Sequence, residues 1–205
     1  VDSTSTQPQP MLAESWDAPS DLRQIKFNLR KGVLFHNGRE FTSADVKFNI
    51  LEQTDPTQFP NSNLSLKQNV TPGAWIKSMD TPDKYTIVFN MGVPRPGIWD
   101  FLEWTNILAQ EAVSHPDFGK NPPVGTGPWI QVEYVAGDHR RYVKNKNYWQ
   151  TGRPYLDEIY LQYFKDEQAM SVALEAGAID TATEPLMRDA ARLRNDPKFK
   201  VLLNP

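Results

Sequence analysis

The sequence predicts a mixed α/β fold, and three segments carry that prediction. Residues 23–30 alternate apolar and polar side chains, which is the period of a half-buried strand. Residues 75–91 hold two strand-like runs around a turn-forming stretch, which predicts a hairpin. Residues 166–177 repeat apolar side chains at the spacing of one helical face. Both strands and helices therefore belong to the expected fold.

The first strand and the helix after it are specified by local signals. Within residues 23–30 three apolar side chains share one face and are expected to be buried: Ile25, Phe27 and Leu29. Thr42 is a good N-cap for a short helix that ends before Pro56. The side chains of this helix that face inward are expected to be Val46 and Ile50.

The hairpin in residues 75–91 is expected to turn at residues 80–83 (Asp-Thr-Pro-Asp), because these residue types favour turns. Its second strand has a clean alternation of three apolar side chains: Tyr85, Ile87 and Phe89. Two short helices are expected next, at residues 97–102 and 108–114.

Residues 121–128 (Asn-Pro-Pro-Val-Gly-Thr-Gly-Pro) form a rigid crossing with few amide donors free for a strand. A domain boundary is expected there. The two glycines are expected to be structural, because glycine permits backbone conformations that a Cβ atom would block. After the crossing, three strand-like runs are expected: 130–134, 141–144 and 159–163.

The most clearly specified helix begins after Asp166, a good N-cap, and ends at Gly177. Its expected inward stripe has helical spacing: Ala169, Val172, Ala173 and Ala176. Pro185 suits the first turn of another helix, which stops before Asp196. Residues 198–203 are expected to form a final short strand.

Composition indicates a globular protein of 205 residues, because 39% hydrophobic and 11% aromatic residues are too many for a disordered chain. The sequence has no Cys, and its length suffices to bury a core without disulfides. No apolar run approaches the roughly 18–20 residues of a membrane span. The net charge of -3 argues against a nucleic-acid partner, so the basic stretch 139–146 is interpreted as a solvated strand edge.

No sequence pattern points to catalysis, a metal or a cofactor. His36, His115 and His139 lie far apart, without carboxylates at ligand spacing. Residues 125–129 (GTGPW) superficially resemble a dinucleotide-binding loop, but the third glycine is missing and Pro128 removes an amide donor. No Gly-x-Ser-x-Gly motif is present. Carboxylate pairs are abundant, so a hydrolase acting on oligomers stays open as an alternative.

Trp104, Thr105 and Asn106 are the candidate ligand-binding residues. They follow the expected helix at 97–102 and combine a flat aromatic surface with hydrogen-bonding side chains, which is how ligand pockets are commonly lined. The alternative is that Trp104 caps the hydrophobic core. The residues alone leave both interpretations open.

Several ordered blocks closely resemble the extracellular solute-binding proteins of family 5, the peptide, oligopeptide and nickel receptors of ATP-driven importers. The first are residues 12–16 (LAESW), 27–38 (FNLRKGVLFHNG) and 41–46 (FTSADV). Further matches follow in the same order along the chain: 72–74, 85–89, 125–128, 147–149, 154–157 and 174–180. The resemblance covers nearly the whole chain.

The resemblance implies a truncated lobe of the type II periplasmic-binding-protein-like fold. Residues 1–124 then correspond to the accessory domain of the first lobe, and residues 125–205 to part of its central sheet domain. Members of the family are much longer, so the second lobe is expected to be absent from this chain. The missing front of the parent protein would carry a signal or lipid anchor.

By the same resemblance, the chain is expected to be the substrate-binding part of an ABC importer and not an enzyme. It would bind a peptide or other small solute, as a monomer, in the periplasm or outside the cell, and deliver it to a membrane permease. The loop after residues 94–102 faces the ligand cleft in relatives, which favours Trp104, Thr105 and Asn106 as ligand contacts. A sensory ligand-binding domain of a regulator is a second alternative.

Overall fold

The structure is a computed structural model that describes the following residues: 8–54, 75–115, 117–118, 120–183 and 187–202. The chain divides into two units, unit 1 with residues 1–132 and 142–159, and unit 2 with residues 133–141 and 160–205. The assignment of 1–124 to an accessory domain and of 125–205 to a central sheet domain stays a prediction.

A four-stranded antiparallel sheet of order β1-β2-β4-β3 organises unit 1. Its strands are β1 (Ala13–Asp17), β2 (Gln24–Leu29), β3 (Ile76–Asp83) and β4 (Thr86–Met91). Alternate residues of β2 are exposed and buried, as its sequence period predicts. The buried ones are those expected: Ile25, Phe27 and Leu29.

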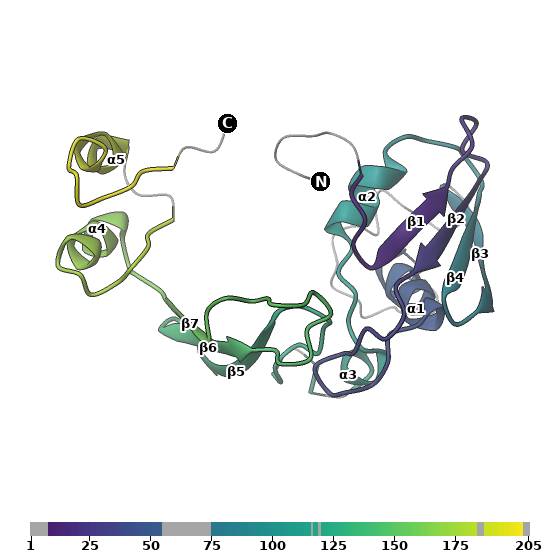
Figure 1. The fold of residues 1–205 in the computed structure, drawn as a ribbon, viewed down its shortest axis with the longest axis horizontal. Helices are drawn as coiled ribbons and strands as arrows, with labels where there is room; N and C mark the ends of the chain where they lie inside the picture. The colour runs from purple at the N-terminus through teal and green to yellow at the C-terminus, as the bar shows by residue number, and fades with distance from the viewer. Residues whose placement is uncertain (1–7, 55–74, 116, 119, 184–186, 203–205) are drawn as a thin grey trace. The chain divides into compact units, whose positions relative to one another are not determined.

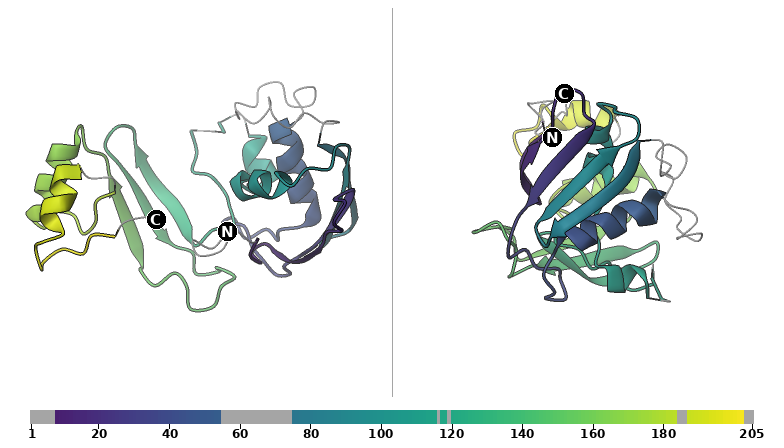
Figure 2. Two further views of the ribbon diagram at one scale, coloured as in Figure 1. Left: turned by 90° about the horizontal axis from the view of Figure 1, so that it is seen from above. Right: turned by 90° about the vertical axis from the view of Figure 1, so that its right-hand side faces the viewer.

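Helices α1 (Ser43–Thr54) and α2 (Ile98–Trp104) lie on one side of this sheet, as Figures 1 and 2 show. Helix α1 follows Thr42, as predicted. The side chain that caps its N-terminal end is Asp45, whose carboxylate accepts the Thr42 N–H at 2.9 Å. The expected inward side chains of α1 are buried in the core: Val46 and Ile50. Helix α3 (Gln110–Val113) falls within the second of the two helical segments predicted after the hairpin.

The turn expected at residues 80–83 is wrong. These residues belong to β3, and the chain reverses at Lys84 and Tyr85. The pairing of β3 with β4 shifts register between Asp80 and Asp83, which marks a bulge. Strand β3 is at the edge of its sheet, where a bulge and Pro82 are tolerated because one side of the strand has no ladder to complete.

A second sheet has three strands in the order β5-β6-β7. They are β5 (Trp129–Val135), β6 (His139–Lys144) and β7 (Glu158–Gln162), which confirms the three strand-like runs expected after the crossing. The chain passes between unit 1 and unit 2 within each of these strands.

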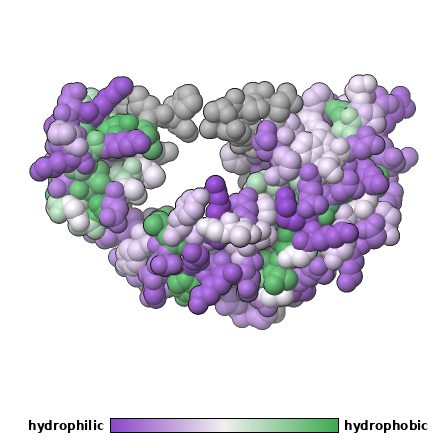
Figure 3. Space-filling model, viewed as in Figure 1, coloured by the Kyte–Doolittle hydropathy of each residue, from purple (hydrophilic) through white to green (hydrophobic). Residues whose placement is uncertain are grey.

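The helices of unit 2 are α4 (Glu167–Glu175) and α5 (Met187–Leu193). Asp166 caps α4 as predicted, because its Oδ1 accepts the Ala169 N–H at 2.7 Å. The expected inward stripe of α4 is wrong, since Val172 is 61% exposed and Ser171 is the buried residue. Apolar surface is visible over these helices in Figure 3. Pro185 lies outside the described residues, and residues 198–202 form no strand.

The basic stretch 139–146 begins on β6, the middle strand of its sheet, so its interpretation as a solvated strand edge is wrong. His139 lies 2.7 Å from Asp138 Oδ2 and stacks on Tyr160 with ring centroids 4.7 Å apart. The hydrogen bond to Asp138 raises the pKa of His139 above its ordinary value. The Arg140 guanidinium lies over the ring of Tyr134, 4.7 Å from its centroid.

Candidate functional site

The three residues proposed from sequence as ligand contacts lie at the C-terminal end of α2. Trp104 is the last residue of the helix, and it is 73% exposed, so it does not cap the core. Thr105 is the C-cap and is half-buried, with its hydroxyl donating to the Phe101 carbonyl at 2.8 Å. Asn106 is exposed. Thr105 thus holds the end of the helix, while Trp104 and Asn106 remain available to a ligand.

A buried amide fixes the chain just beyond these residues. Asn49, on α1, donates from Nδ2 to the Leu108 carbonyl at 2.8 Å and accepts the Leu108 N–H on Oδ1 at 3.0 Å. Its side chain therefore satisfies both backbone groups of Leu108. The next residue, Ala109, donates its N–H to the Val124 carbonyl at 2.8 Å. The segment after Trp104 is consequently tied to the core of unit 1 rather than loosely attached.

Arg39 joins two segments that are distant in sequence. Its guanidinium makes a bidentate contact with Asp45, at 2.6 and 3.1 Å, and its Nε donates to Glu111 at 2.9 Å. Asp45 is only 3% exposed, whereas Glu111 is 47% exposed. The Arg39 hydrogen bond is the main reason that the pKa of Glu111 falls to about 2. This arrangement links the start of α1 to α3.

The depressed pKa of Glu111 predicts a loss of stability in acid. The ionised Glu111 carboxylate contributes fully to the free energy of unfolding above its ordinary pKa of about 4.5, and this contribution disappears as the pH falls through about 2. Because Glu111 is half-exposed, we expect its ion pair to contribute about 1 kcal/mol or less to the free energy of unfolding. Urea unfolding at about pH 6 and about pH 3 should show a smaller pH dependence for Glu111→Gln than for the unmodified chain. An equal reduction in Glu14→Gln would contradict this assignment.

The crossing at residues 125–128 is held by side chains rather than by glycine geometry. Neither Gly125 nor Gly127 has a positive φ, and a Cβ atom on Gly127 would meet nothing within 4 Å. The expectation that the glycines are sterically required is therefore wrong. Instead, His36 Nδ1 accepts the Gly125 N–H at 3.3 Å, and His36 Nε2 lies 3.1 Å from the Gly127 carbonyl. The buried Asn145 also donates to that carbonyl, at 2.9 Å.

Sequence analysis missed the clamping roles of His36, Asn49 and Asn145. Each makes its contacts with backbone 18 to 91 residues away in sequence. The only local signal is that Asn49 occupies the inward side of a helix among apolar residues. A buried amide in that position requires partners, although the sequence does not say which.

A cavity of about 490 Å³ opens between the inner face of the four-stranded sheet and α2. We call it the apolar cavity, and the following aromatic side chains contribute to its lining: Trp16, Phe27, Phe41, Phe89, Trp99, Tyr148 and Trp149. Of the three candidate residues, Thr105 lines it, whereas Trp104 and Asn106 do not. The structure therefore does not gather all three on one surface of this cavity. Its volume is within the usual range for small-molecule sites.

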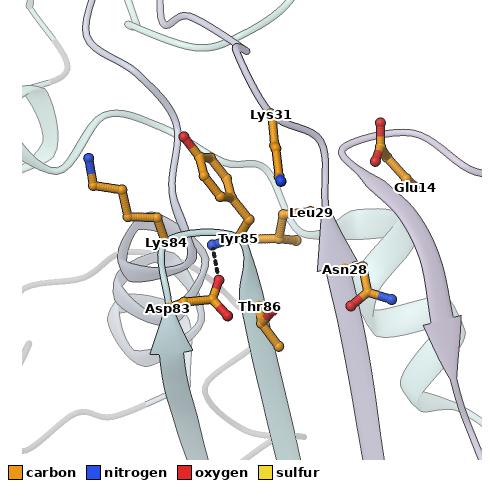
Figure 4. Close-up of a pocket in the computed structure, with 8 residues that line it drawn as sticks. All are labelled: Glu14, Asn28, Leu29, Lys31, Asp83, Lys84, Tyr85 and Thr86. Atoms are coloured by element: carbon orange, nitrogen blue, oxygen red, sulfur yellow. Dashed lines mark hydrogen bonds between the residues drawn. The ribbon is translucent and has the colours of Figure 1, made fainter.

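A second hollow, of about 590 Å³, lies on the outer side of the same sheet (Figure 4). Charged groups of both signs line it, among them Glu14, Lys31, Asp83 and Lys84. The acids already have partners, because Glu14 pairs with Arg30 at 3.3 Å and Asp83 accepts the Tyr85 N–H at 2.7 Å. The hollow is open and polar, so it offers a small ligand less enclosure than the apolar cavity.

Two other kinds of feature, a metal-binding cluster and a membrane-spanning helix, are absent from the described residues. No group of three or more His, Asp or Glu side chains there could hold a metal ion. No helix in that part of the chain is long and apolar enough to cross a membrane.

Comparison with known sequences identifies a matching family. Residues 7–205 match the family described as bacterial extracellular solute-binding proteins, family 5 Middle. A curated relative is heme-binding protein A of Haemophilus influenzae, which is 32% identical over 97% of this chain and 39% of its own length. The chain thus spans about two fifths of that relative.

Solved structures have the same fold. The binding protein AgaA of A. tumefaciens R10, solved with agropinic acid, has a TM-score of 0.81 and 28% identity over 91% of this chain and 37% of its own. The periplasmic binding protein DppA of Helicobacter pylori, solved with the peptide STSA, has a TM-score of 0.79 and 27% identity over 94% of this chain and 41% of its own. The mixed α/β, periplasmic-binding-protein-like fold is therefore established for the matched part.

Proposed function

Because the chain belongs to the bacterial extracellular solute-binding proteins of family 5, we propose that it captures a small solute as part of the substrate-binding component of an ABC importer. The family match over residues 7–205 carries this proposal. The proposed partners are a peptide or other small solute and a membrane permease. The proposed state is a monomer outside the cytoplasm, attached to the membrane in the parent protein.

We further propose that Trp104, Thr105 and Asn106 form part of the surface that contacts the solute. The exposure of Trp104 supports this, because a large aromatic ring that buries little of its surface gains free energy when a ligand covers it. The anchoring of Leu108 by Asn49 also supports it, because a fixed segment loses less conformational entropy on binding.

The affinity of the 205-residue chain is expected to be low. It spans about two fifths of its relatives, and solutes in hinged receptors are enclosed from two sides. Losing about 4 kcal/mol of contact free energy weakens binding roughly a thousandfold, which converts a micromolar dissociation constant into a millimolar one.

The test is an NMR titration of the isotope-labelled chain with the peptide Ser-Thr-Ser-Ala and, separately, with agropinic acid. At least one solute should give saturable chemical shift changes centred on residues 104–106. Trp104→Ala should abolish these changes, whereas Tyr155→Ala should leave them intact. Tyr155 is a matched control because its side chain is 79% exposed and distant in sequence.

Three results would count against the proposal. Saturable shifts that survive in Trp104→Ala would place the contact elsewhere. Absence of saturable shifts with both solutes would remove support for solute capture by this part of the protein. Release of cleaved peptide, detected by mass spectrometry and lost on replacing one carboxylate, would favour the hydrolase alternative.

A further inference from the structure

The apolar cavity is an unfilled space lined by aromatic side chains, which in an ordinary protein core would be covered by other side chains. Its floor comes from β2 and β4, through the buried side chains of Phe27 and Phe89, which pack with ring centroids 5.1 Å apart. Protein interiors have few voids larger than a water molecule, and an empty apolar cavity lowers stability. An apolar molecule in this space would restore the missing dispersion contacts.

Three tryptophans form the part of the wall that a ligand could contact most extensively. Trp16, Trp99 and Trp149 all line the cavity, and each is half-buried. Trp16 and Trp99 lie with ring centroids 5.8 Å apart and planes tilted by 51°. Tilted aromatic faces of this kind accommodate another flat ring by edge or offset contacts.

Helix α2 gives the rim of the cavity a negative charge. Asp100 and Glu103 line it beside Trp99, and among the residues that the structure describes no Lys, Arg or His belongs to the lining. Asp100 is exposed and forms no ion pair or side-chain hydrogen bond with another residue that the structure describes. A ligand cation placed there would gain an ion pair without displacing an existing one.

A cation that contacts the lining residue Trp149 does not cancel this charge. Arg30 lies over the ring of Trp149, 4.5 Å from its centroid, but it is not part of the lining. Its N–H groups are used by the Met11 carbonyl at 3.1 Å and by Glu14 at 3.3 Å. The rim therefore favours a positive ligand group over a negative one.

We propose that the apolar cavity is a binding site for a small molecule with an aromatic body and a cationic amine. The aromatic body lies against Trp16 and Trp99, and the amine faces Asp100. The cavity shares Thr105 with the proposed solute contact, but the aromatic body and the amine contact Trp16, Trp99 and Asp100, none of which belongs to that solute contact. The proposal therefore does not depend on the proposed function.

The test compares two probes of similar size and opposite charge, 4-phenylbutylamine and 4-phenylbutyrate, on the full 205-residue chain. The indole N–H signals report the location, because three tryptophans line the cavity and three do not: Trp16, Trp99 and Trp149 against Trp75, Trp104 and Trp129. The amine should shift the lining set and bind about two- to fivefold more tightly than the carboxylate, the range of one exposed ion pair.

Charge variants decide whether Asp100 is responsible. Asp100→Asn should remove the preference for the amine, and Asp100→Lys should reverse it so that 4-phenylbutyrate binds more tightly. Asp17→Lys makes the same charge change on β1, outside the cavity lining, and should leave the preference unchanged. The thermal unfolding midpoint of each variant confirms that it is folded.

Several outcomes would overturn the proposal. Equal affinities for the two probes would show that the rim charge does not select the ligand. Shifts confined to Trp104 would place the probes at the proposed solute contact instead. No saturable shift of Trp16, Trp99 and Trp149 with either probe would show that the cavity is closed to such molecules, for example by another segment of the protein.

Discussion

Asn49→Leu is expected to lower the free energy of unfolding by about 3 kcal/mol, because leucine leaves the half-buried N–H and carbonyl of Leu108 without their side-chain partners. Each unsatisfied buried group costs about 1–3 kcal/mol, and leucine has nearly the shape of asparagine, so a cavity contributes little. Urea unfolding followed by circular dichroism measures the change.

The matched control is Asn28→Leu, which removes an exposed amide that donates to Ser15 at 3.0 Å. That variant should change stability by less than about 1 kcal/mol, because water replaces the lost hydrogen bond. Similar losses in both variants would show that the Leu108 contact is not a major source of stability. A large loss in Asn49→Leu alone would also explain how the segment after Trp104 keeps its position.

Asp45→Ala is expected to cost about 3 kcal/mol as well. The variant removes the bidentate contact with Arg39 and the carboxylate oxygen that accepts the Thr42 N–H. Breaking a buried ion pair typically costs about 3–5 kcal/mol, and the value here is at the lower end because Arg39 is 37% exposed. Thermal unfolding and urea unfolding should both report the loss.

Asp45→Asn separates the two contributions. The amide oxygen can still accept the Thr42 N–H, but the uncharged side chain no longer neutralises Arg39. The free energy of unfolding of Asp45→Asn should therefore lie between that of Asp45→Ala and that of the unmodified chain. If Asp45→Ala changed stability by less than about 0.5 kcal/mol, the cluster around Arg39 would be an incidental surface contact.

Local patterns predicted elements well where one physical cause dominates. The two-residue period of β2 specifies a strand with one buried face, and the structure has the expected Ile25, Phe27 and Leu29 inside. The turn at residues 80–83 was mispredicted, because Pro82 and Asp83 also occur at a bulge on an edge strand. The stripe on α4 was mispredicted because helical spacing defines a face without determining what covers it.

The candidate site could be predicted only in part. The residue types at 104–106 suggested a ligand surface, and the exposure of Trp104 removes the alternative that it caps the core. The apolar cavity could not be predicted, because its lining extends from Pro8 to Trp149 and no local pattern joins those residues. The same holds for the contact of His36 with Gly127, 91 residues away.

The strand order β1-β2-β4-β3 has a consequence for how fast unit 1 folds. Strand β2 pairs with β4 only after a long loop has closed, because Gln24 and Asn90 are 66 residues apart in sequence. The contact of Asn49 with Leu108 likewise joins residues 59 positions apart. Chains dominated by such distant pairings pay loop-closure entropy before their contacts form, and they fold in milliseconds to seconds rather than microseconds. During that interval the apolar faces of β2 and β4 are exposed together, so unit 1 has a period in which it is open to misassociation with other chains.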